Sequence, residues 1–409
     1  MDDLKQRAAD LDAADPLSGW RGRFIIPDGL IYLDGNSLGV LPGNVPARVA
    51  DAVARGWGEQ LIRGWNAEGW MDLPRRIGDR IARLIGAAEG SVICADSTSI
   101  NLAKVLQAAL AMVPERQVVL SDTGNFPTDL YVAQGQLGQA GTLKVVAPED
   151  VAAAMTPEVG VLMLTEVDYR SGRLQDMHGL TDRARDLGIV TIWDLAHSAG
   201  ALPVDLAGAG ADFAVGCGYK YLSGGPGAPA FLYVRPELQN RVSSRLTGWM
   251  GHAAPFAFDP DYHPAEGIDR FRVGTPPILS MVAMDAALDV WDGVDMQAVR
   301  AKSLSLGDLF IACIDRFASA YDLHLASPRD GNHRGSQVSW HCPDGYAVMQ
   351  ALIDRGVIGD FREPDVIRFG FTPLYLSYAE VVKAAAILQD ILRRRTWDQP
   401  QFHARARVT

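Results

Sequence analysis

An aspartate and a lysine in the middle of the chain are the residues whose types and spacing suggest chemistry. Asp194 follows the apolar run 189–193, Lys220 follows the apolar run 213–217, and the glycine-rich stretch SGGPGAP comes soon after the lysine. In an open α/β sheet, ligands bind outside the carboxyl ends of the strands, so both side chains are expected in one crevice. Pyridoxal phosphate requires this combination: an amine that binds its aldehyde and a carboxylate that keeps its pyridine nitrogen protonated.

A segment earlier in the chain suits the phosphate of such a cofactor. In CADSTSINLAK, residues 94–104, an apolar run is followed by Ser97 and Thr98 and then by a helical pattern. A helix N-terminus offers free N–H groups and positive dipole density, which bind phosphate. Either residue also suits an ordinary N-cap, and the two roles are compatible. Tyr219, beside the lysine, is a further candidate to reach the phosphate with its hydroxyl.

These residues need a sheet to position them, and the sequence between them predicts one. Most of the apolar runs are apolar on both faces, which is typical of parallel strands covered by helices. Helical patterns at 100–112 and 180–188 complete βα units. We therefore predict an α/β fold, with a large domain at 46–280 and a mainly parallel seven-stranded sheet. The seven predicted strands are 91–95, 117–121, 143–147, 159–165, 189–193, 213–217 and 230–234.

The pattern changes after residue 280. Long amphipathic helical segments come first, followed by short strand-like runs at 336–342 and 366–371 and by a helical pattern near the end. This predicts a smaller α+β domain at 281–409. The segment 1–45 is expected to pack with that domain or with a partner subunit.

Composition narrows the classes of function. Among 409 residues, acidic groups outnumber basic ones and give a net charge of −11, which argues against non-specific nucleic-acid binding. Four scattered cysteines and eight histidines show no metal-ligand spacing, so we expect no metal site. No apolar stretch approaches the roughly 18 residues of a membrane span. The acidic start lacks the pattern of a secretion signal, so we expect a cytoplasmic protein without a membrane partner.

Eight motifs in order resemble fold-type I pyridoxal-phosphate enzymes of the class V aminotransferase group. Within that group the sequence is similar to the kynureninase family over nearly the whole chain. NFPTDLY together with DLAH and GTPP is much more specific than the lysine motif, which the whole group shares. The motifs are YLDGNSLG (32–39), STS (97–99), NFPTDLY (125–131), DLAHSAG (194–200), GYKYLSGGPG (218–227), GW (248–249), FRVGTPPI (271–278) and IRFGFTPLY (367–375).

The resemblance implies roles around the cofactor. It implies that Lys220 binds pyridoxal 5′-phosphate covalently and moves protons, that Asp194 pairs with the pyridine N–H, and that His197 lies near that pair. Phe126 is implied to stack on the ring. The other implied cofactor residues are Ser97, Thr98 and Tyr219 at the phosphate, Pro127, Thr128 and Asp129 beside Phe126, Thr165 and Asp168 near the phenolic oxygen, and Trp249 and Thr275 at the cofactor of the other subunit of a homodimer.

The resemblance also implies a reaction and a substrate. The reaction is the hydrolytic Cβ–Cγ cleavage of L-kynurenine to anthranilate and L-alanine, with Tyr219 as the candidate proton relay. Arg368 is implied to bind the substrate carboxylate, which suits a guanidinium fork, and Asn36 and Ser37 are implied to lie near it. A glycine at position 274 suits kynurenine better than its 3-hydroxy form. Trp65, with Trp70, either lines the aromatic pocket or only packs within a helical region.

Other functions remain to be weighed. A cysteine desulfurase or selenocysteine lyase shares this scaffold and needs a nucleophilic cysteine late in the chain, where Cys342 is the one candidate. A generic aminotransferase is disfavoured by FPTD and GTPP. A non-catalytic regulator would usually carry a DNA-binding segment, and none is visible. A metal hydrolase is disfavoured by the histidine spacing.

Overall fold

The structure, a computed structural model, describes residues 2–405 and divides into two compact units. The large unit comprises Asn44–Asp168 and Gln175–Asp289; the small unit comprises Met1–Gly43, Tyr169–Leu174 and Val290–Thr409, as far as they are described. The division falls after residue 289 rather than after residue 280, because the helix Ile278–Ala287 packs against two helices of the large unit. The short segment 169–174 joins the small unit, which the sequence did not suggest.

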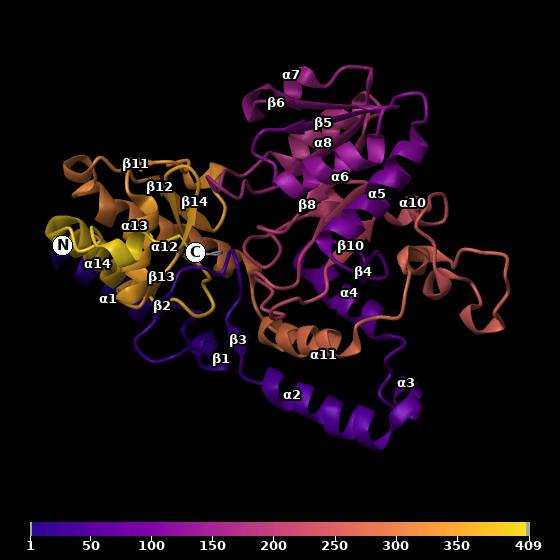
Figure 1. The fold of residues 1–409 in the computed structure, drawn as a ribbon, viewed down its shortest axis with the longest axis horizontal. Coiled ribbons are helices and arrows are strands. Elements are labelled where there is room, and N and C mark those ends of the chain that lie inside the picture. Colours follow the sequence, from indigo (N-terminus) through magenta and orange to yellow (C-terminus); the bar gives the residue numbers. More distant parts are fainter. Residues whose placement is uncertain (1, 406–409) are drawn as a thin grey trace. The chain divides into compact units, whose positions relative to one another are not determined.

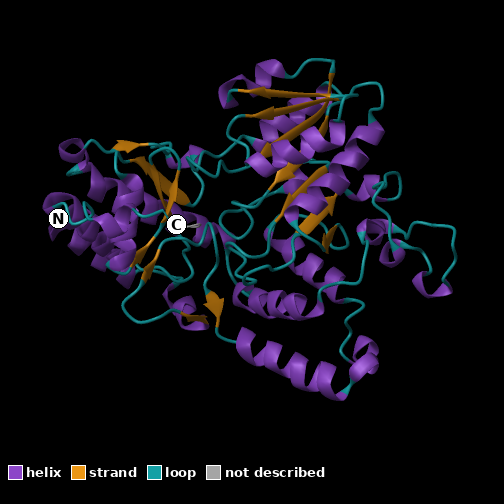
Figure 2. Ribbon diagram, viewed as in Figure 1, coloured by secondary structure: helices purple, strands orange, loops and turns teal. Residues whose placement is uncertain are grey.

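The large unit is built on a seven-stranded sheet, and each of the seven predicted apolar runs forms one of its strands (Figures 1 and 2). The order across the sheet is β4-β10-β9-β8-β7-β5-β6. Neighbouring strands run parallel except that β10 is antiparallel to both β4 and β9, so the prediction of a mainly parallel sheet is confirmed. The strands are β4 (Val92–Cys94), β5 (Val118–Asp122), β6 (Thr142–Val146), β7 (Val159–Thr165), β8 (Val190–Asp194), β9 (Phe213–Gly216) and β10 (Phe231–Val234).

Helices cover this sheet, and the apolar strand residues explain why. Every residue of β7 and β8 is buried, as expected for strands covered on both faces. Helix α5 places Leu102, Val105 and Leu106 in the core that lines the sheet. The helices of this unit are α2 (Val45–Asp51, continued by a π-helical stretch Ala52–Glu59), α3 (Gly64–Ala67), α4 (Leu73–Leu84), α5 (Thr98–Met112), α6 (Pro127–Leu137), α7 (Val151–Ala154), α8 (Met177–Asp186), α9 (Leu206–Ala209), α10 (Pro236–Gln239) and α11 (Ile278–Ala287).

The small unit contains a four-stranded sheet in the order β11-β12-β15-β14, with long helices beside it. The N-terminal segment belongs to this unit, since β2 pairs in parallel with β13 and Asp34 bridges to Gly370. Its elements are α1 (Asp2–Ala13), β1 (Phe24–Ile25), β2 (Ile31–Tyr32), β3 (Leu41–Pro42), α12 (Met296–Asp315), β11 (His324–Leu325), β12 (Gln337–His341), α13 (Gly345–Asp354), β13 (Val357–Ile358), β14 (Asp360–Arg362), β15 (Val366–Gly370), α14 (Tyr378–Arg394) and α15 (Pro400–His403).

Within residues 2–405, no helix combines the length and the apolar character needed to cross a bilayer.

Candidate active site

The predicted residues fall into two clusters, one in each unit, and the lysine cluster lies in the large unit. Lys220 stands in the loop that follows β9, and its Nζ lies 2.9 Å from Nε2 of His197. The same Nζ is 5.9 Å from the centre of the Phe126 ring and 5.8 Å from that of Tyr219. His197 lies in a buried turn after β8. The structure thus brings together a lysine, a histidine and two aromatic rings.

Asp194 is the last residue of β8, beside β9 in the sheet. Its side chain is buried, and Oδ1 accepts a 2.8 Å hydrogen bond from the backbone N–H of Ala196. Burial raises the pKa of Asp194, while the positive charge of Lys220 acts in the opposite direction. Asp194 and Lys220 therefore interact at the carboxyl edge of the sheet, where the sequence placed both.

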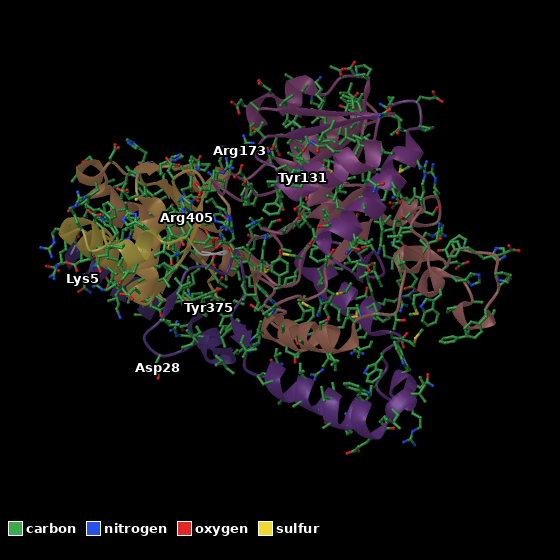
Figure 3. The ribbon with its side chains drawn as sticks, in the orientation of Figure 1. Lys5, Asp28, Tyr131, Arg173, Tyr375 and Arg405 are labelled. Atoms are coloured by element: carbon green, nitrogen blue, oxygen red, sulfur yellow. The ribbon has the colours of Figure 1, made fainter. Side chains whose placement is uncertain are left out.

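A second buried carboxyl group, that of Asp129, pairs with Asp194. Asp129 lies in the first turn of α6, the helix marked by Tyr131 in Figure 3. Burial, followed by the negative charge of Asp194, raises the pKa of Asp129 well above its usual range, while the hydrogen bond between the two lowers that of Asp194. The shared hydrogen bond thus acts in opposite directions on the two pKa values and favours Asp129 over Asp194 as the protonated acid. The sequence placed Asp129 near the cofactor but gave no sign of this pairing.

Phe126 and the two residues after it form the entrance to α6. Phe126 is the N-cap residue and its ring is 42% exposed, unusual for a phenylalanine beside a buried carboxyl pair. Pro127 and Thr128 begin the helix, where the fixed φ of a proline is favourable. The Phe126 ring therefore lies beside Lys220 and outside the buried core.

The segment predicted to hold phosphate forms the start of α5. Ser97 is the N-cap, its side chain accepts from the N–H of Ile100 at 3.4 Å, and Thr98 is the first helical residue. The prediction of an N-cap is confirmed. The residue before it, Asp96, has a left-handed φ of 46°. The first N–H groups of a helix lack intrahelical partners, so this turn can bind an anion.

Thr165 ends β7, the strand next to β8, and Asp168 lies in the loop that follows. Thr165 lies beside Asp194 in the register of β7 and β8, and its Oγ1 donates to the carbonyl of Val167 at 3.1 Å. Asp168 lies close against Gly124, where a Cβ would clash with the Asp168 carboxylate. Glycine at 124 therefore allows this carboxylate to approach the loop that leads to Phe126.

Tyr219, a candidate to reach the phosphate, lies next to Lys220 in the loop that follows β9. Its hydroxyl contacts the thiol of the buried Cys217, and burial raises the pKa of Tyr219 above its ordinary value. The phenol therefore keeps its proton at neutral pH and is available as a hydrogen-bond donor.

Four further predicted residues lie in loops or short helical turns of the large unit. Trp249 is 41% exposed and packs edge-on against Phe256, with 5.8 Å between ring centres. Thr275 and Gly274 are exposed and border a cavity of about 30 Å³ that Asp96 also lines. Trp65 packs edge-on against the buried Trp70 at 5.8 Å, which is the packing role that the sequence left open.

The second cluster, in the small unit, is centred on Arg368. This residue is 1% exposed, so its guanidinium is buried within the small unit. It faces Asp360 in the register of β14 and β15, and its Nε donates to Asp360 Oδ1 at 2.7 Å while a second nitrogen pairs with Oδ2. Ser37 Oγ accepts from the guanidinium at 3.0 Å, and the carbonyl of Tyr169 accepts another N–H.

Two residues of the YLDGNSLG segment complete this cluster. Asn36 is 1% exposed, and neither polar atom of its side chain has a hydrogen-bond partner among the described residues. Buried amides without partners are rare, so this one is suited to a ligand. Burial, then the charge of Asp360, raises the pKa of Asp34 to about 7. Sequence analysis did not identify Asp34 or Asp360 as site residues. Asp34 lies within the motif YLDGNSLG, which could have drawn attention to it, whereas no motif surrounds Asp360.

Cys342, the candidate nucleophile of a desulfurase, is buried. Burial raises the pKa of its thiol to about 12. A reactive cysteine needs a lowered pKa and access to solvent, so the structure disfavours that alternative.

Comparison with known proteins first defines the class. A cysteine desulfurase from Thermococcus onnurineus superposes with a TM-score of 0.75 at 18% identity, covering 92% of this chain and 98% of that one. A C-DES variant with glycine covalently linked to its pyridoxal-phosphate cofactor gives 0.77 at 17% identity, covering 90% and 98%. The fold is therefore that of the fold-type I pyridoxal-phosphate enzymes.

The sequence then narrows the class to one family. A kynureninase from Pseudomonas fluorescens is 51% identical over 407 residues, or 98% of each chain. The family model of the kynureninase C-terminal domain matches residues 299–388. The chain belongs to the kynureninase family.

Proposed function

We propose that this protein is a pyridoxal-phosphate-dependent kynureninase, which hydrolyses the Cβ–Cγ bond of L-kynurenine to give anthranilate and L-alanine. One observation carries the proposal: the Lys220 amine and the exposed ring of Phe126 lie beside the buried carboxyl pair of Asp129 and Asp194. The family membership and the fold agree with it.

The residues in the large unit fit the cofactor. Lys220 supplies the amine, the exposed ring of Phe126 supplies a stacking surface, and Asp194 supplies a buried anion for a protonated ring nitrogen. The start of α5 at Ser97 and Thr98 supplies free N–H groups for the phosphate. When bound, the cofactor draws electrons from the substrate, so that the Cα proton and then the Cβ–Cγ bond become labile.

Each side chain around the lysine has a task. Asp194 holds the ring nitrogen protonated, and Asp129 keeps Asp194 ionised by donating a hydrogen bond to it. Lys220 removes and returns protons at Cα, a role that suits an amine which can release its proton. His197, 2.9 Å from the Lys220 amine, orients it. Thr165, the last residue of β7, and Asp168, three residues later, would contact the cofactor on the side of its phenolic oxygen.

The hydrolytic step adds water to the carbonyl carbon of the substrate. The hydroxyl of water joins that carbon, the Cβ–Cγ bond breaks, and Cβ takes up a proton, so the products are anthranilate and alanine. Tyr219 keeps its phenolic proton because its pKa is raised, and it serves as the proton donor in this step.

Arg368, the buried cation of the small unit, is the group proposed to bind the substrate carboxylate, which would join or replace its present acceptors. Asn36, whose buried amide lacks a partner among the described residues, and Ser37 complete this subsite. Gly274 favours kynurenine over the 3-hydroxy substrate.

We further propose that the active unit is a homodimer, in which Trp249 and Thr275 reach the cofactor of the other subunit. The exposure of both residues supports this. We also propose that the protein is cytoplasmic.

A product assay tests the function. The protein is incubated with L-kynurenine and pyridoxal phosphate, and anthranilate is followed by fluorescence and alanine by chromatography. Equal amounts of the two products are expected. Release of sulfide from cysteine without anthranilate would favour the desulfurase alternative, and a keto acid in place of alanine would favour an aminotransferase.

A further inference from the structure

Lys104 is a buried cation that the roles proposed above do not use. It lies on α5, two turns beyond the phosphate turn, and is 0% exposed. Lysine is almost never fully buried unless it is paired. Burying a charged ammonium costs free energy unless hydrogen bonds and an opposite charge compensate for the lost water.

The contacts of Lys104 match an ammonium group. Its Nζ pairs with the carboxylate of Asp96, donates to Asn101 Oδ1 at 3.2 Å, and donates to the carbonyl of Phe271 at 2.7 Å. An ammonium has three N–H donors, and these three acceptors use all of them. Burial lowers the pKa of Lys104, and the charge of Asp96 opposes that effect. The geometry is therefore that of a charged lysine whose donors are satisfied.

Two of the acceptors, Asp96 and Asn101, belong to the start of α5, and the third is the carbonyl of Phe271. Asp96 directly precedes the N-cap Ser97, has a left-handed backbone, and accepts a hydrogen bond at its carbonyl from the N–H of Ala230 at 2.9 Å. Phe271 begins the segment that leads to Thr275. Lys104 thus connects the turn at the start of α5 with the segment that begins at Phe271.

We propose that Lys104 is a positioning residue for the cofactor phosphate, holding the turn at Asp96 and Ser97 in its anion-binding form. Two physical effects support it. The ammonium neutralises the carboxylate of Asp96, which would otherwise repel a phosphate at the next residue. It also fixes the left-handed residue that aims the first N–H groups of α5. The inference rests on the proposed function, because it requires that this turn binds the phosphate.

The test compares two aldehydes that differ only in the phosphate. Cofactor-free protein is titrated with pyridoxal phosphate and with pyridoxal, and the covalent complex with Lys220 is followed by absorbance. Lys104→Met keeps the aliphatic stem and removes the charge. We expect it to weaken binding of pyridoxal phosphate about tenfold, the effect of one charge-assisted hydrogen bond, while binding of pyridoxal changes less than about twofold.

Lys144→Met is the matched control, since Lys144 lies on β6 and is 35% exposed; it should leave both affinities unchanged. An equal loss for the two aldehydes, or no loss, would overturn the proposal. If Lys104→Met does not fold, Lys104→Gln, which keeps two N–H donors, carries the same measurement. If neither folds, Lys104 serves the fold alone and the proposal fails. Failure of the proposed function looks different, because the unchanged protein would then bind neither aldehyde covalently.

Discussion

Two regions of the molecule each combine a pair of buried carboxyl groups with a basic side chain, for different purposes. In the large unit Asp129 and Asp194 lie with Lys220, and in the small unit Asp34 and Asp360 lie with Arg368. Burial raises the pKa of a carboxyl group in both regions. In each, one acid keeps the charge and its neighbour takes the proton.

The cations explain the difference between the regions. Burial acts to raise the pKa of Asp360, but the charge and hydrogen bonds of Arg368 outweigh it and hold that pKa below its usual value. Burial also raises the pKa of Asp194, and the Lys220 amine opposes it without a direct ion pair in the structure described. A guanidinium is permanently charged and forms a fixed clamp, whereas an amine can lose its proton and form a covalent bond. The first suits recognition of a carboxylate and the second suits catalysis.

Removing the amine should have the largest effect. Lys220→Ala is expected to lower kcat by at least about a thousandfold, because both covalent attachment of the cofactor and proton transfer at Cα are lost. The measurement is the rate of anthranilate formation, together with the absorbance band of the bound cofactor. Substantial turnover by this variant would show that another group carries the chemistry.

Breaking the clamp should mainly affect stability and substrate binding. Arg368→Met leaves Asp360 buried without its closest partner, so the free energy of unfolding should fall by about 3 kcal/mol, and KM should rise. Urea denaturation and steady-state kinetics measure the two effects. Arg362→Met is the control, since Arg362 also pairs with Asp360 at 2.9 Å but is 32% exposed; it should cost less than about 1 kcal/mol. Equal losses would contradict the special position of Arg368.

The two acids of the large unit should differ in importance. Asp194→Asn removes the anion and should lower kcat roughly a hundredfold, the value of a strong charge-assisted hydrogen bond. Asp129→Asn keeps a donor toward Asp194 and should cost less than about tenfold. Comparing kcat of the two variants at saturating cofactor tests which of the two acids is protonated. A larger loss of kcat in Asp129→Asn than in Asp194→Asn would indicate that Asp194 carries the proton.

Asp34 of the small unit should make the free energy of unfolding depend on pH. The pKa of Asp34 is about 7 in the folded protein against 3.8 as its ordinary value. Between these values the unfolded chain ionises and the folded chain does not, so the contribution of Asp34 to stability is full below pH 3.8 and lost as pH rises to about 7. Asp34→Asn should remove this slope. Denaturation of both proteins between pH 4 and about 8 measures it, and parallel curves would refute the raised pKa.

The smallest effect is expected at the exposed glycine. A Cβ at Gly274 would meet no atom of the described residues within 4 Å, so Gly274→Ser should change the free energy of unfolding by less than about 0.5 kcal/mol. The ratio of kcat/KM for 3-hydroxykynurenine to that for kynurenine should rise. An unchanged ratio would remove this position from substrate selection.

Local patterns were sufficient for much of the fold. All seven strands of the large sheet were predicted, because strands covered on both faces are continuous apolar runs. The positions of Asp194 and Lys220 followed from where two runs end. The domain division was less accurate, since the packing of α11 on α2 and α4 involves residues far apart in sequence.

The amino-acid sequence alone therefore determined the positions of the seven strands along the chain, the placement of Asp194 and Lys220 at strand ends, and the family. Tertiary structure alone decided which acids share a proton, which guanidinium is buried against Asp360, and where the ammonium of Lys104 finds its acceptors. The reason is physical: apolar periodicity is local, whereas desolvation and charge depend on neighbours that folding brings together from distant segments.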